Sequence, residues 1–232
     1  STSFAAYNNY GLLCKTRGEL DKAESLLLKA RELAPNSDKP HFNLGLVYFA
    51  KRDYDRAKSM FLRAAKLNPQ DAFPIVMIGK ILRIQDKASE AIEFFEKRLE
   101  KYGKSAELRT ELGVSYFHAG QEDKAISEFD KAIELSRSLP DPYINKAAIL
   151  LDRNETDEAI KLAEKAITFA ARAEAHNILG AAYAHQGQYA KALKEFLTAY
   201  KISPQFPGLI DNIANVLMDL NNYKAAQEFC SE

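Results

Sequence analysis

Residues 41–49 read HFNLGLVYF, and this stretch decides the fold. It is strongly apolar and has the spacing of a helix, yet Gly45 lies in its middle, where a glycine costs roughly 1 kcal/mol relative to alanine. A glycine there indicates that another helix packs closely against this one. The stretch has relatives elsewhere in the chain: YNNYGLLC (7–14), IVMIGKIL (75–82), RTELGVSY (109–116) and HNILGAAY (176–183).

The recurrence extends to three columns of residues at nearly constant spacing. Small residues lie 33 or 34 positions apart, at Gly11, Gly45, Gly79, Gly113, Ala147, Gly180 and Ala214. Twelve positions after each of them comes an alanine: Ala23, Ala57, Ala91, Ala125, Ala159, Ala192 and Ala226. Four positions further on lie Leu27, Phe61, Phe95, Phe129, Ala163, Phe196 and Cys230. Such a period indicates a stack of small units, none of which can bury its apolar face alone.

Each unit divides into two helical patterns joined by a short polar turn, such as KRDY, AGQED or DRNET. The pattern resembles the tetratricopeptide repeat family over essentially the full chain. The resemblance implies an all-α, right-handed α-solenoid of helix-turn-helix units over residues 1–232. The units are expected at about 4–37, 38–71, 72–105, 106–139, 140–172, 173–206 and, in part, 207–232.

Composition excludes several classes of function. The 232 residues contain 32 Lys and Arg and 32 Asp and Glu, so a net charge of zero gives no general attraction for nucleic acid or an anionic membrane. A run of about 18 apolar residues that could insert directly into a bilayer is missing.

The chain opens with STSFAAYNNYG, without a start methionine or a secretory segment. This opening predicts a piece of a longer chain, from which an N-terminal targeting signal could have been removed. Cys14 and Cys230 lie far apart and favour a reducing compartment such as the cytoplasm.

The resemblance also implies which first-helix residues face the concave groove of the solenoid, where members of the family bind partners. An apolar patch there is predicted from Phe42, Leu46, Phe49, Val76, Val114, Phe117, Ile144 and Leu151. The groove is one interpretation of these residues, and packing against neighbouring repeats is the other. The partner-binding set predicted from the sequence is Asn9, Phe42, Asn43, Leu46, Phe49, Val76, Lys80, Arg83, Val114, Phe117, Asn145 and Asn212.

Asparagine recurs two positions before the small residue, at Asn9, Asn43, Asn145 and Asn212, with Asn177 offset by one. Some members of the family use such a ladder of carboxamides to hold the backbone of a bound segment. Local hydrogen bonding within the fold is the alternative role. The lysine, asparagine and arginine set with which another subclass clamps a chaperone's terminal carboxylate is missing, since Asn43 has no cationic neighbours in that register.

No catalytic or cofactor-binding motif accompanies the repeats, and the sequence predicts a non-enzyme without cofactor. His118, Asp152, His185 and Asp219 occupy one column in successive units, but neighbouring helices pack 8–10 Å apart while zinc ligands lie near 2 Å from the metal. A polar strip is therefore expected there rather than a metal site. His41 and His176 occupy a packing position of the family.

The sequence thus predicts a protein-interaction scaffold that binds a protein or peptide segment of unknown identity in its groove. Two alternatives remain open at this point. One is a self-assembling module that forms homo-oligomers through uncapped end repeats, and the other is the regulatory arm of a larger enzyme.

Overall fold

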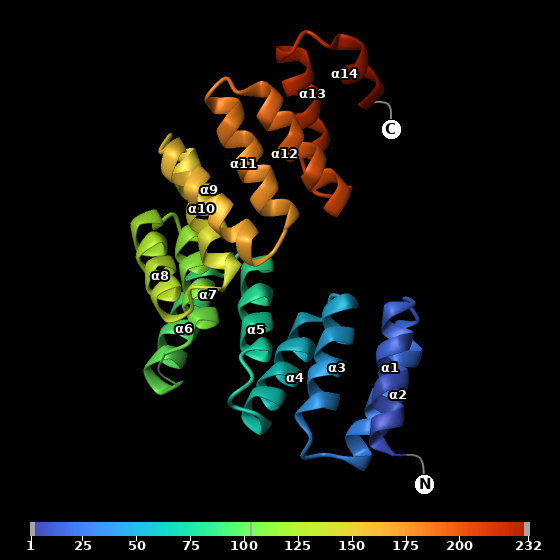
Figure 1. Cartoon of the computed structure of the whole chain (residues 1–232). Coiled ribbons are helices and arrows are strands. Elements are labelled where there is room, and N and C mark those ends of the chain that lie inside the picture. The colour runs from blue at the N-terminus through green and yellow to red at the C-terminus, as the bar shows by residue number, and fades with distance from the viewer. Residues whose placement is uncertain (1–2, 103, 230–232) are drawn as a thin grey trace. The chain divides into compact units, whose positions relative to one another are not determined.

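The computed structural model describes residues 3–102 and 104–229, and within these ranges it contains fourteen α-helices and no strand (Figure 1). The helices are α1 (Phe4–Thr16), α2 (Leu20–Leu33), α3 (Asp38–Ala50), α4 (Tyr54–Leu67), α5 (Phe73–Ile84), α6 (Ala88–Tyr102), α7 (Ala106–His118), α8 (Glu122–Leu135), α9 (Pro140–Asp152), α10 (Thr156–Phe169), α11 (Ala173–His185), α12 (Tyr189–Ile202), α13 (Leu209–Asp219) and α14 (Tyr223–Phe229). The expected all-α architecture is confirmed.

Consecutive helices pair into hairpins, α1 with α2 and so on to α13 with α14 (Figure 1). Every hairpin turn contains one residue in the left-handed region, with φ between 56° and 78°. These residues are Gly18, Arg52, Asp86, Gly120, Asn154, Gly187 and Asn221. Glycine, asparagine and aspartate tolerate this conformation better than other residues, which explains why they recur in the turns.

The glycine column packs against the aromatic column within each hairpin. A methyl group placed on Gly45 would lie 2.5 Å from Cε1 of Phe61, and one on Gly113 would lie 2.6 Å from Cε1 of Phe129. Phe61 is completely buried. The close helix contact therefore requires glycine, and burial of a phenylalanine ring, worth about 2 kcal/mol or more, offsets its cost to the helix.

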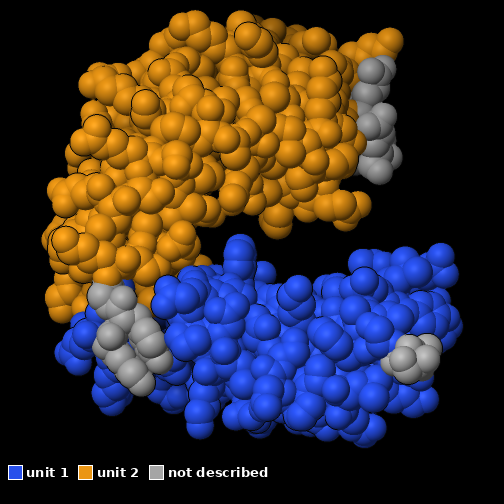
Figure 2. Space-filling view, turned by 60° about the horizontal axis from the view of Figure 1, so that its bottom comes forward, with its two compact units in different colours: residues 1–103 blue, residues 104–232 orange. Residues whose placement is uncertain are grey.

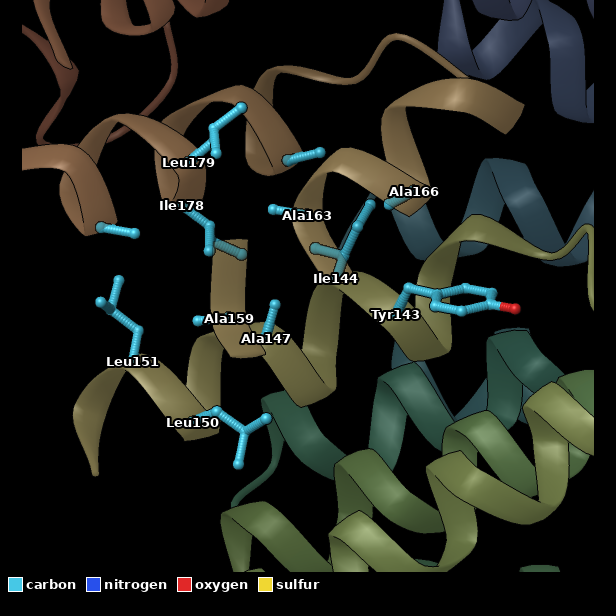
Figure 3. Packing of buried hydrophobic residues seen from close by; sticks show 12 residues of the cluster. Tyr143, Ile144, Ala147, Leu150, Leu151, Ala159, Ala163, Ala166, Ile178 and Leu179 are labelled. Carbon is cyan, nitrogen blue, oxygen red and sulfur yellow. The ribbon is translucent and has the colours of Figure 1, made fainter. Parts of the chain in front are cut away.

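The fifth hairpin solves the same packing problem with different residues. Ala147 replaces the glycine and Ala163 replaces the phenylalanine, and both are fully buried in one cluster with Leu150, Ile178 and Leu179 (Figure 3). A larger residue on α9 thus accompanies a smaller residue on α10, and apolar side chains from α11 join the cluster. The two exceptions to the repeat pattern, Ala147 and Ala163, therefore compensate each other in volume.

The chain divides into two compact units, residues 1–103 and 104–232, which we call unit 1 and unit 2 (Figure 2). The division falls after a repeat that departs from the pattern, since Arg98 stands where the equivalent positions of other repeats are Ala30, Ala64, Ala132, Ala166 and Ala199. In unit 1, Phe61 and Phe95 are fully buried. In unit 2, one buried cluster lies over α9–α11, and a second includes Phe196 and Ile213.

Candidate partner-binding surface

The first helix of each hairpin has two faces of different character. On α5, Ile75, Ile78 and Leu82 point into the core and are at most 5% exposed. On its other side, Phe73 is 72% exposed and Ile84 is 49% exposed. We call this second side of a first helix its outer face. On α5 it consists of Phe73, Val76, Met77, Lys80, Arg83 and Ile84, and on α3 of Lys39, Phe42, Leu46, Phe49 and Ala50, all exposed or half-buried. The equivalent residues of α1 are Ala5, Asn9, Leu12, Lys15 and Thr16, which are also exposed or half-buried.

In unit 1 the structure places most of the predicted site residues on this outer face. Asn9 and Lys80 are exposed, whereas Leu46, Phe49, Val76 and Arg83 are half-buried. Phe42 is also half-buried, but its ring packs on Phe61 with the two centroids 5.6 Å apart. Phe42 therefore supports the core of its hairpin in addition to bordering the outer face.

In unit 2 the predicted residues are only partly accessible. Phe117 is 38% exposed, while Val114, Asn145 and Asn212 are half-buried. Ile144 and Leu151 were expected in the apolar patch, and that expectation is wrong. Their exposed fractions are 7% and 8%, because they join the buried cluster formed by α9, α10 and α11.

Two of the asparagines bond across neighbouring first helices. Asn43 Nδ2 donates to Asn8 Oδ1 over 2.8 Å, and Asn212 Nδ2 donates to Asn177 Oδ1 over 2.9 Å. Both pairs are 35 residues apart, one more than the repeat length, because adjacent first helices are staggered where they meet. Asn43 is only 7% exposed, so its bond to Asn8 belongs to the packing between the helices and the residue is not accessible on the outer face. Asn212 is half-buried, and because a carboxamide has two N–H donors and an acceptor oxygen, one bond leaves it with further hydrogen-bonding capacity.

The outer face also brings together two predicted residues from successive hairpins. Lys80 Nζ on α5 lies 5.7 Å from the centroid of the Phe49 ring on α3, a cation–π arrangement. The Phe49 ring in turn meets Tyr54 edge-on, with centroids 5.8 Å apart. Phe49 is thus held between the first residue of α4 and a cation of the next hairpin.

A recurring polar clamp between repeats was not anticipated from the sequence. Lys51 donates to Asp21 over 2.7 Å and also to Glu24, which holds the pKa of both carboxyl groups below the ordinary values. At the equivalent place in unit 2, Arg153 donates to Glu122 over 2.8 Å and to Asp123 over 2.9 Å. The detectable signal was a cation about 30 residues after an acid, a spacing that follows from the repeat length.

Two of the four histidines lie within hydrogen-bond distance of another part of the fold. His41 Nε2 lies 3.2 Å from the carbonyl oxygen of Pro35, and His176 Nδ1 lies 2.7 Å from Glu195 Oε2. His118 and His185 lie exposed at the ends of their helices. Among the described residues, no group of three or more His, Cys, Asp or Glu is placed to hold a metal ion. Cys14 is buried and free, and Cys230 lies outside the described residues.

Helices long and apolar enough to cross a membrane are absent from the part of the chain that the structure describes. Three family models, each described as tetratricopeptide repeat, match residues 2–70, 76–140 and 173–206.

Two curated proteins are similar to parts of the chain. The human Protein O-mannosyl-transferase TMTC1 is 26% identical over 140 residues, which are 60% of this chain and 16% of that protein. The bovine BBSome complex member BBS4 is 30% identical over 118 residues, which are 50% of this chain and 22% of that protein. The chain thus spans less than a quarter of either relative.

Among solved structures, yeast Tom70 resembles the chain with a TM-score of 0.81 and 20% identity, over 96% of this chain and 48% of that one. At this identity the likeness shows the fold alone, and it confirms the expected α-solenoid class.

Proposed function

Because the chain belongs to the tetratricopeptide repeat family, we propose that it is a non-catalytic protein-interaction scaffold that binds a segment of a partner protein on the outer faces of its first helices. In unit 1 the binding residues would be Asn9, Phe42, Leu46, Phe49, Val76, Lys80 and Arg83. In unit 2 they would be Val114, Phe117, Asn145 and Asn212.

The observation that carries the proposal is the exposure of large apolar side chains on the outer face of α5. Phe73 and Ile84 are 72% and 49% exposed, although Phe95 and Ile78 already fill the core of the same hairpin. Exposed apolar residues that gather on one helix face are typical of interaction sites. The half-buried Val76 and Met77 lie on the same face and extend it.

The names of the two curated relatives fit the proposal in one case and an alternative to it in the other. The bovine relative is named as a member of a complex, which fits a scaffold. The human relative is named as an O-mannosyl-transferase, and the matched segment is 16% of its length, which fits the alternative that such repeats form the arm of an enzyme.

A selection of random peptides on the full chain tests the proposal. The selected peptides should bind the double variant Phe73→Ala and Ile84→Ala about tenfold more weakly, because both truncations remove apolar contact area from a site that the core does not use. The matched control is Leu33→Ala with Leu62→Ala, which truncates two exposed side chains on second helices.

Circular dichroism should give the same helicity for wild type and both variants, because none of the four side chains is buried. If no peptide can be selected, or if the selected peptides bind wild type and the α5 variant equally, the proposed surface is wrong.

Self-association is a second candidate, favoured by the apolar surface of the last hairpin. Met218, Leu220 and Tyr223 are 46%, 39% and 64% exposed on α13, α14 and the turn between them. Light scattering over a range of concentrations tests this candidate directly. If the measured mass stays that of a monomer at every concentration, self-association is excluded, while the proposal of peptide binding still stands.

A further inference from the structure

The charges of the first helices are sorted by unit, although the chain as a whole is neutral. In unit 1 the helices α1, α3 and α5 are described completely, and their charged residues are four cations and one acid. The cations are Lys15, Lys39, Lys80 and Arg83, and the acid is Asp38.

The single acid of these helices, Asp38, is bonded to a residue at the end of α4, the second helix of its hairpin. Asp38 Oδ2 accepts a hydrogen bond of 3.1 Å from Asn68 Nδ2, at the end of α4. The other acids of unit 1 lie on second helices or in turns, where Asp21 and Glu24 are bonded to Lys51. The outer face of α1, α3 and α5 therefore carries positive charge without a carboxylate of its own.

Unit 2 has the opposite distribution. The helices α7, α9, α11 and α13 carry the acids Glu107, Glu111, Asp141, Asp152, Glu174, Asp211 and Asp219. Their two basic residues other than histidine are bonded to second helices. Arg109 donates to Glu128 over 2.7 Å, and Lys146 donates to Asp130 over 2.6 Å. The positive first-helix face is thus a local property of unit 1 and not a feature of the repeat.

On α5 the positive charge is combined with exposed apolar surface. Phe73, Lys80 and Ile84 are spaced as i, i+7 and i+11, so they form one stripe along the helix. Lys80 remains exposed while its ammonium group lies over the Phe49 ring. A ligand of this face must cover apolar side chains and supply negative charge beside them.

We propose that the outer face of α1, α3 and α5 binds an acidic segment of a partner protein in which Asp or Glu residues alternate with apolar residues. The acidic side chains would meet Lys39 and Lys80, and the apolar ones would cover Phe73 and Ile84. Complementary charge would speed association and select against basic segments. This inference rests on the proposed function and specifies the chemistry of its ligand.

A nucleic acid fits the face less well than an acidic peptide. Phosphate binding gains from many cations, whereas this face combines its four with exposed Phe73 and Ile84.

Fluorescence anisotropy with the full chain tests the proposal. The probe is a labelled peptide of about 16 residues with the repeat Asp-Leu-Glu-Phe, and its counterpart has lysine at every acidic position. We expect the acidic probe to bind, and the variant Lys39→Glu with Lys80→Glu to weaken its binding by about tenfold or more. Binding should also weaken when salt is raised from about 0.05 to 0.3 M.

Two control variants separate the face from overall charge. Arg63→Glu with Lys66→Glu makes the same charge change on α4 and should alter affinity by less than about twofold. The conservative pair Lys39→Arg with Lys80→Arg should retain binding. The lysine-containing peptide should show no dependence on Lys39 and Lys80.

The inference is overturned if the acidic probe fails to bind, if both charge-reversal variants weaken it equally, or if a single-stranded oligothymidylate displaces it from wild type. Failure of the acidic probe, while selected peptides still depend on Phe73 and Ile84, overturns this inference alone. Failure of every peptide overturns the proposed function as well.

Discussion

At the scale of single residues, the fold depends on a size exchange between two columns. Gly45 costs helix stability, but a methyl group at this position would lie 2.5–2.9 Å from three atoms of the Phe61 ring. In the fifth hairpin the exchange runs the other way, with Ala147 beside a short Ala163. The repeat therefore constrains the combined volume of the two side chains more than the volume of either one.

This exchange can be measured in the fifth hairpin. Ala163→Phe alone should cost about 1–3 kcal/mol of the free energy of unfolding, because the added ring meets the Ala147 methyl group. Ala147→Gly with Ala163→Phe should recover at least about 1 kcal/mol of the summed single effects, because it rebuilds the Gly45–Phe61 arrangement. Urea unfolding followed by circular dichroism gives the four values of the cycle. Additive effects would show that the two positions are independent.

How far the sequence predicts single residues depends on where their contacts lie. The packing residues of HFNLGLVYF were predictable, since Leu44 and Tyr48 follow from the period and are buried. The partner of Asn43 was not, because the bond to Asn8 depends on a one-residue stagger between neighbouring helices. Ile144 and Leu151 were misplaced for a related reason, since α11 covers them and its position is a tertiary property.

At the scale of elements, a hydrogen bond ties some first helices to the loop before them. His41 Nε2 lies 3.2 Å from the Pro35 carbonyl oxygen, and Tyr143 Oη donates to the Arg137 carbonyl oxygen over 3.1 Å. Both bonds span six residues at equivalent places in the repeat. Histidine and tyrosine therefore serve the same purpose, but only histidine changes its charge near neutral pH.

The difference predicts a pH effect on stability. Burial lowers the pKa of His41 below its ordinary value of 6.5, the hydrogen bond to Pro35 opposing this only in part. As the pH falls below 6.5, the unfolded chain takes up this proton before the folded chain does, so the free energy of unfolding decreases from pH 7 to pH 5. His41→Tyr should keep the bond and flatten this decrease, measured as Tm against pH.

Tyr143→Phe is the matched control for the histidine variant. It removes the equivalent hydrogen bond and should lower stability by about 1 kcal/mol, equally at pH 5 and pH 7. A His41→Tyr variant with the same pH dependence as wild type would show that other groups cause the decrease.

At the scale of the whole molecule, stability should be local. In a stacked-repeat protein each repeat contacts only its neighbours, so an energetic change spreads over adjacent repeats and fades beyond them. The contacts within unit 1 follow this rule, since α2 packs on α3 and α4 packs on α5. The charge of the first helices is local in the same sense. Cations predominate on those of unit 1 and acids on those of unit 2, and each unit's own residues determine this charge.

Hydrogen exchange of the full chain tests this locality. Gly45→Ala disturbs the contact with Phe61, so amides of α1–α4 should exchange about tenfold faster or more, while those of α9–α12 keep their wild-type protection. Ala163→Phe should give the reverse pattern, because its overpacking lies between α9 and α10. Equal acceleration in both units by either variant would instead mean that the repeats unfold as one cooperative body. In that case a partner bound to unit 1 would stabilise unit 2 as well, and binding would slow exchange throughout the described helices rather than in α1–α5 alone.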